Sequence, residues 1–100
     1  MTTLKPSLPD ALRKIRKARG LSQEAFSDVS SRTYLSSLER GLKSPTITKL
    51  TELCEVMKIH PITLLTLAYS DGDAQNFHNI LAQVQNELKE ITDTFHSIGG

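Results

Sequence analysis

The placement of proline and glycine constrains this chain more than any other feature of its 100 residues. Proline occurs only at positions 6, 9, 45 and 61, and glycine only at 20, 41, 72, 99 and 100. Between these breakers the apolar residues recur with the 3.6-residue period of an amphipathic helix, and no stretch keeps the alternation typical of a strand. The sequence therefore predicts an all-α protein whose helical segments cover residues 8–19, 23–29, 32–40, 47–57, 61–69 and 74–97.

Residues that favour helix ends accompany several of these segments. Ser7 precedes the first segment and Asp10 follows three residues later, which is the spacing of a capping box. Gly20 suits the left-handed position just after that helix. His60 stands directly before Pro61 and is expected to cap the fifth segment.

Composition excludes several classes of protein. The single cysteine, Cys54, cannot form an internal disulfide, lies in an apolar helical stripe and is expected to be a small buried hydrophobe. The three histidines are far apart and give no zinc-site spacing. No apolar run approaches a membrane span, and the first residues lack the apolar stretch of a signal peptide. We therefore expect a cytoplasmic protein with no metal, no cofactor and no membrane partner.

Charge is divided unevenly along the chain. Residues 1–69 hold eleven Lys/Arg and six Asp/Glu, a formal charge of +5, whereas residues 70–100 hold one Lys and five Asp/Glu, a charge of −4. Five of the seven residues from Arg13 to Arg19 are basic. Such a run is typical of a solvated helix face, but it also fits a surface that binds phosphates.

The third segment has a small, polar outward face on the predicted helix. It follows the short second segment after a turn of a few residues, as in a helix-turn-helix. Small hydroxyls and an arginine are groups that the base edges of a DNA major groove accept, although an ordinary surface helix would show the same pattern. The residues of this face are Arg32, Thr33, Ser36, Ser37 and Arg40.

Three stretches form a more specific pattern: residues 12–26 (LRKIRKARGLSQEAF), 32–41 (RTYLSSLERG) and 44–46 (SPT). In this order, residues 12–65 resemble the Cro/CI-type (XRE) helix-turn-helix family, the fold of lambdoid phage repressors. The resemblance implies a five-helix lambda-repressor-like domain over residues 1–70 that binds double-stranded DNA.

The resemblance also implies roles for individual residues. Gln23 matches a position that grips a phosphate, and Arg40 and Lys43 match positions that clamp the DNA backbone. Arg16 and Glu39 match a structural ion pair between the first and third helices. Arg32 is the best candidate for direct readout, because arginine can bond guanine O6 and N7 together. The positions that face bases are Ser31, Arg32, Thr33, Ser36 and Ser37.

The chain departs from the family pattern in three places. The segment from Ser22 to Tyr34 is shorter than usual, and residues 28–31 (DVSS) replace the glycine normally found in the turn. Lys58 stands where the family often has glycine at the end of the fourth helix. The resemblance therefore leaves the turn geometry and the N-cap of the third segment open, with room for the base-contact positions to shift by one residue, and the corner at Lys58 is expected to differ.

The last segment, within residues 73–98, carries an apolar seam. Its members are spaced 4, 3, 4, 3, 4 and 3 residues apart, which is the a/d repeat of a coiled coil. This pattern favours homodimerisation, although the helix could instead fold back on its own domain. The seam consists of Phe77, Leu81, Val84, Leu88, Ile91, Phe95 and Ile98.

Together these features predict a homodimeric, sequence-specific regulator of transcription that represses at a palindromic operator. One alternative is an antitoxin whose last helix binds a toxin while the first domain autoregulates through DNA. Another is an adaptor that retains the helix-turn-helix only as a scaffold. An enzyme is not expected, because no catalytic triad, nucleophile elbow or glycine-rich phosphate loop is present.

Overall fold

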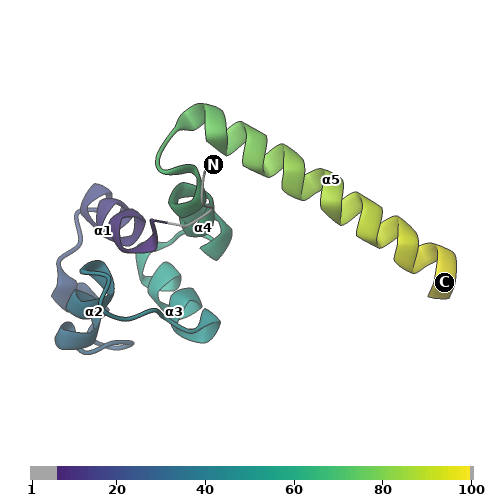
Figure 1. Ribbon diagram of the computed structural model, residues 1–100. Coiled ribbons are helices and arrows are strands. Elements are labelled where there is room, and N and C mark those ends of the chain that lie inside the picture. The colour runs from purple at the N-terminus through teal and green to yellow at the C-terminus, as the bar shows by residue number, and fades with distance from the viewer. Residues whose placement is uncertain (1–6, 100) are drawn as a thin grey trace.

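The computed structural model describes residues 7–99, and all regular secondary structure in that range is helical, so the all-α prediction is confirmed (Figure 1). Residues 1–6 of the predicted domain and the side chain of Ile98 lie outside the described part. In chain order the elements are α1 (Leu8–Ala18), the 3₁₀ helix η1 (Gln23–Phe26), α2 (Arg32–Glu39), α3 (Ile47–Met57), α4 (Pro61–Ser70) and α5 (Ala74–Gly99).

The core is built from the inward faces of the elements from α1 to α4. Phe26 supplies the one large aromatic side chain among the fully buried residues, and Cys54 is buried beside aliphatic neighbours, as predicted. Because every one of these elements contributes to a single cluster, the short helices are positioned by packing rather than by their own stability. The buried apolar residues are Ala11, Leu12, Phe26, Leu35, Leu38, Leu50, Leu53, Cys54, Met57, Leu64 and Ala68.

The start of α1 differs from the predicted capping box. Ser7 is the N-cap residue, but its hydroxyl makes no cap bond and donates instead to Asp71 Oδ1 at 3.2 Å. Pro9 lies in the first turn and has no N–H to offer a capping oxygen. The backbone N–H of Ser7 also donates to the Ala68 carbonyl at 2.9 Å, so the start of α1 is tied to α4.

The second predicted helix, residues 23–29, is shorter than expected. After η1 ends at Phe26, the N–H groups of Val29 and Ser30 both donate to the Phe26 carbonyl at 2.9 Å. Ser31 must be extended to cap α2, and the four residues between Phe26 and Ser31 therefore turn instead of continuing a helix.

The ends of α3 and α4 follow the sequence closely. Thr46 accepts from the N–H of Lys49 and caps α3, and His60 Nδ1 accepts from the N–H of Ile62 and caps α4 as predicted. Lys58 occupies the left-handed region at φ 59°, ψ 44°, the position where the family often has glycine. Glycine adopts this conformation readily, whereas lysine is unfavourable in it because of its Cβ.

Helix α5 leaves the rest of the molecule as a straight rod (Figure 1). Its 26 residues correspond to about 39 Å at the α-helical rise. The radius of gyration, 15.9 Å, exceeds the roughly 13 Å expected for a compact chain of this length, because α5 projects outward. None of the described helices, α5 included, is apolar over a long enough stretch to span a bilayer.

Candidate nucleic-acid interface

The start of α2 presents three of the predicted base-facing residues to solvent. The Ser31 hydroxyl accepts from the N–H of Tyr34 at 3.1 Å, which makes Ser31 the N-cap and fixes where the helix begins. Ser31, Arg32 and Thr33 are all exposed. The first turn of α2 is therefore a free polar edge of the size that a major groove admits.

The next turn of α2 corrects the predicted face in part. Ser36 is half-buried, whereas Ser37 is only 8% exposed, so its place on the outward face was wrong. The N–H of Leu42 donates to the Ser37 carbonyl and that of Gly41, at φ +75°, to the Leu38 carbonyl. These two bonds form a Schellman motif that folds the chain back at the end of α2, where Ser37 lies.

A buried ion pair links α2 to α1, as the resemblance implied. Arg16 Nε and Nη2 donate to the two carboxylate oxygens of Glu39 at 2.6 and 2.9 Å, and the side chains are only 11% and 4% exposed. Arg16 also donates to the Leu21 carbonyl at 2.9 Å. The hydrogen bonds to Glu39 raise the pKa of Arg16 above its ordinary value, so the Arg16 guanidinium stays charged in spite of its burial.

Gln23 joins the same network. Its Nε2 donates to Glu39 Oε1 at 3.3 Å, and the residue is half-buried at the start of η1. Gln23, which is predicted to bind a DNA phosphate, is therefore positioned by the same Glu39 carboxylate that binds Arg16. One of the two N–H donors of the amide is used in this way, and the second could reach a ligand.

Arg32 and Gln23 line one shallow surface pocket together with Arg16, Ser22 and Glu24. Arg32 Nη1 lies 3.8 Å from Glu24 Oε1, and both side chains are largely exposed. An exposed pair of this kind is weak and leaves the guanidinium free to take another partner. The sequence prediction missed Glu24, although an acidic residue beside the predicted phosphate ligand was visible in the motif.

Arg40 and Lys43 lie at the other end of α2. Arg40 is its exposed C-cap residue, and Lys43 Nζ lies 5.7 Å from the centre of the Tyr34 ring. The aromatic ring attracts the Lys43 ammonium group, and this contact restricts the conformations of the lysine side chain. The predicted clamping residues thus flank the helix whose first turn carries Arg32.

The turn between η1 and α2 has a stabilising contact that sequence reasoning missed. Lys49 Nζ from α3 donates to the Val29 carbonyl and also contacts Glu52 Oε1 at 3.0 Å. The backbone carbonyl of the glycine-free turn is thereby satisfied by a side chain 20 residues away. Nothing local to the turn could have indicated this contact.

The basic run on α1 is only partly free. Asp10 Oδ1 contacts Arg13 at 3.0 Å and Asp10 Oδ2 contacts Lys14 at 2.9 Å. Hydrogen bonds from Lys14 and Arg13 lower the pKa of Asp10 below its ordinary value. Lys17 and Arg19 are exposed. Two of the five cations of this run are thus paired with Asp10, and a third, Arg16, is paired with Glu39. These three side chains have partners within the protein, and only part of the run is available to bind phosphates.

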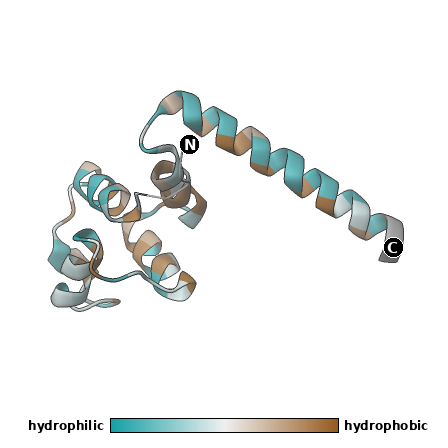
Figure 2. Cartoon of the chain, in the orientation of Figure 1, coloured by the Kyte–Doolittle hydropathy of each residue, from teal (hydrophilic) through white to brown (hydrophobic). Residues whose placement is uncertain are grey.

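The predicted assembly seam lies on α5. Phe77 is half-buried, and Leu81, Val84, Leu88, Ile91 and Phe95 are all exposed large apolar side chains. Brown apolar bands recur along the otherwise polar helix (Figure 2).

Within the described residues, no group of three His, Cys, Asp or Glu side chains could hold a metal ion.

The short helices η1 and α2, joined by a tight turn and locked to α1 by a buried ion pair, define a helix-turn-helix domain. A family model described as helix-turn-helix matches residues 12–64. A similar protein is an uncharacterized HTH-type transcriptional regulator, y4dJ, of Sinorhizobium fredii (strain NBRC 101917 / NGR234), which is 40% identical over 55 residues, 53% of this chain and 71% of the relative.

The chain belongs to this helix-turn-helix family, of the Cro/CI (XRE) type. It is a DNA-binding transcriptional regulator in class, and the family is not one of enzymes, in agreement with the sequence analysis.

Proposed function

We propose that this protein is a homodimeric repressor that reads a palindromic DNA operator with α2 and excludes polymerase from it. In this proposal residues 1–70 form the DNA-binding domain and residues 73–98 the dimerisation element. The observation that carries the proposal is the exposed first turn of α2, where Arg32 makes only one weak contact, to Glu24, among the described residues.

Direct readout is assigned to Ser31, Arg32 and Thr33, with Ser36 at the margin of the surface. Arg32 is the residue best able to discriminate, since its guanidinium can bond guanine in a bidentate manner, which is worth about 1–3 kcal/mol against a wrong base. The Ser31 hydroxyl already accepts the Tyr34 N–H, but it retains its own proton to donate.

Phosphate contacts are assigned to Gln23, Arg40 and Lys43. These residues bracket the readout turn, with Gln23 on η1, Arg40 at the end of α2 and Lys43 just beyond it. Such contacts would set the position of the domain on the duplex and supply affinity that does not depend on sequence.

Homodimerisation is supported by the exposed seam of α5. Six apolar side chains at roughly 100 Å² each and ~25 cal/mol/Å² correspond to many kcal/mol of burial before the cost of association. A two-fold dimer would read two half-sites about one helical turn apart.

The test begins with selection of bound sequences from random DNA. Arg32→Ala should lower the ratio of the affinity for the selected site to the affinity for random DNA by roughly ten- to a hundredfold. Lys43→Ala should weaken all sequences alike and reduce the salt slope by about one. Lys89→Ala on α5 is the matched control and should change neither quantity. If Arg32→Ala weakens selected and random DNA equally, the readout role is wrong.

A further inference from the structure

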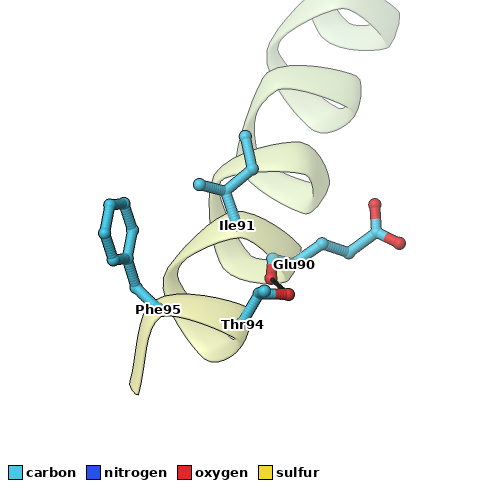
Figure 3. Close-up of a pocket in the computed structure, with 4 residues that line it drawn as sticks. All are labelled: Glu90, Ile91, Thr94 and Phe95. Carbon is cyan, nitrogen blue, oxygen red and sulfur yellow. Dashed lines mark hydrogen bonds between the residues drawn. The ribbon is translucent and has the colours of Figure 1, made fainter. Parts of the chain in front are cut away.

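The apolar seam of α5 is free at one end and occupied at the other. Toward the C-terminus, Leu88, Ile91 and Phe95 are 58%, 57% and 69% exposed. Figure 3 shows Ile91 and Phe95 projecting from one side of the helix, while Glu90 points elsewhere and its carbonyl accepts from the Thr94 hydroxyl. Toward the N-terminus, Phe77 and Ile80 are half-buried, and Phe77 lies beside residues of α1 and α4.

The occupied end borders an apolar groove of about 370 Å³. Phe77 and Leu81 of α5 form one wall, and α1 and α4 form the other through Ile15, Ile62 and Leu67. The domain therefore stands on the same side of α5 as the seam. Ile62 remains 49% exposed, so the described residues leave the groove open.

This position of the domain decides how a second copy can approach. In a parallel pair, Phe77 would face the same residue of its partner, and both domains would compete for the space on the seam side at one end of the pair. In an antiparallel pair, each domain meets the far end of the other α5, which is slender and apolar. The groove thus favours the antiparallel arrangement.

The register follows from the spacing of the seam. From residue 77 to residue 95 the intervals are 4, 3, 4, 3 and 4, which read the same in both directions. Reversal about residue 86 therefore superposes all six positions, and residues whose numbers sum to 172 face each other. Phe77 then faces the partner's Phe95, Leu81 faces the partner's Ile91, and Val84 faces the partner's Leu88.

We propose that a second copy covers the seam in this antiparallel register and that the partner's Phe95 closes the groove lined by Ile15, Ile62 and Leu67. The inference rests on the homodimer of the proposed function and specifies its geometry. Six side chains at roughly 100 Å² each give about 600 Å² per chain, the lower limit for a stable interface, and the groove adds to it. Each DNA-binding domain would thus be held by both chains.

Disulfide mapping tests the arrangement on the full chain with Cys54→Ala, which removes the native thiol. Leu81→Cys and Ile91→Cys chains are purified separately, one with a longer tag, then mixed, re-equilibrated and oxidised. We expect the mixed 81–91 disulfide to dominate, because these positions face each other only in the antiparallel register. Ile47→Cys mixed with Ile91→Cys is the control, since Ile47 is exposed but lies on α3 and should not cross-link.

Dimer strength provides a second measurement. Phe95→Ala and Ile62→Asp should each raise the dimer dissociation constant by about tenfold or more in sedimentation equilibrium, whereas Ile47→Asp should leave it unchanged. Self-linked Leu81→Cys and Ile91→Cys dimers would show a parallel pair and overturn the register while leaving the homodimer intact. Wild-type protein that sediments as a monomer at all concentrations would overturn both the register and the proposed dimer.

Discussion

At the scale of single residues, Glu39 joins the elements that carry the proposed DNA-binding surface, although its own side chain is buried. Its carboxylate accepts from Arg16 on α1 and from Gln23 on η1, while Glu39 itself lies on α2. Three elements therefore meet at one buried charge. Glu39 therefore ties α2 to both α1 and η1 in addition to the apolar core beneath it.

Glu39→Ala is expected to lower the free energy of unfolding by about 3 kcal/mol, because it leaves the Arg16 guanidinium buried without its partner. Urea denaturation followed by circular dichroism measures the change. Asp10→Ala also removes a carboxylate that holds two cations, but these groups are exposed, and the loss should stay under about 1 kcal/mol. Equal losses in the two variants would contradict a special role for the Glu39 pair.

Cys54 carries a prediction about alkaline pH. Burial raises the pKa of its thiol from the ordinary 9.0 to about 11. Between these values the unfolded chain releases a proton that the folded chain keeps, so stability falls as pH rises from about 9 to 11. The midpoint of urea unfolding measured from pH 7 to 11 should decline more steeply in wild type than in Cys54→Ala. Parallel curves would show that the thiol does not contribute to the decline.

At the scale of elements, two helices end with a residue in the left-handed conformation, and the two residues differ in how well they tolerate it. Lys58 ends α3 in the left-handed region, and Asp71 does the same for α4. Aspartate tolerates this conformation, and here its carboxylate also accepts from Ser7. Lysine has no comparable compensation, although its carbonyl accepts from Arg19 Nη2 at 3.4 Å.

Lys58→Gly should therefore raise the free energy of unfolding by about 1 kcal/mol, since glycine reaches positive φ without a Cβ clash. The backbone bond from Arg19 survives the change. Asp71→Gly serves as the comparison and should give no gain, because it removes a tolerated residue and the Ser7 contact. A stabilised Asp71→Gly together with an unaltered Lys58→Gly would reverse this assignment.

The elements also show how far the sequence could predict the structure. Segment 47–57 matches α3 because both ends and the buried stripe are local signals. Segment 23–29 fails after Phe26, where the chain turns toward the extended Ser31 and the Val29 carbonyl accepts from Lys49 of α3. The helical periodicity predicted that Ser37 faces solvent. Ser37 is instead buried at the end of α2, where the chain folds back through Gly41 and Leu42. The errors thus fall where contacts from outside the segment override its own periodicity.

At the scale of the whole molecule, charge and shape separate two regions. The cations assigned to DNA all lie before residue 70, while α5 is acidic and projects away from the core (Figure 1). An acidic rod is repelled by phosphate, so it is suited to the side of the protein that faces away from the duplex. Substitutions on α5 can therefore disrupt assembly without removing any of the cations assigned to DNA.

Salt dependence tests whether assembly doubles the DNA contacts. Leu88→Asp places a charge in the seam and should yield a monomer whose binding curve, log K against log salt, has about half the wild-type slope, because half as many phosphates are neutralised. Fluorescence anisotropy on the selected site, with sedimentation of the free protein, gives both quantities. Asn86→Asp adds the same charge two residues away on the opposite side of α5, and it should keep the dimer and the full slope. A monomeric Leu88→Asp with an unreduced slope would mean that one domain alone makes every phosphate contact, and the two-half-site mode of reading would then be wrong.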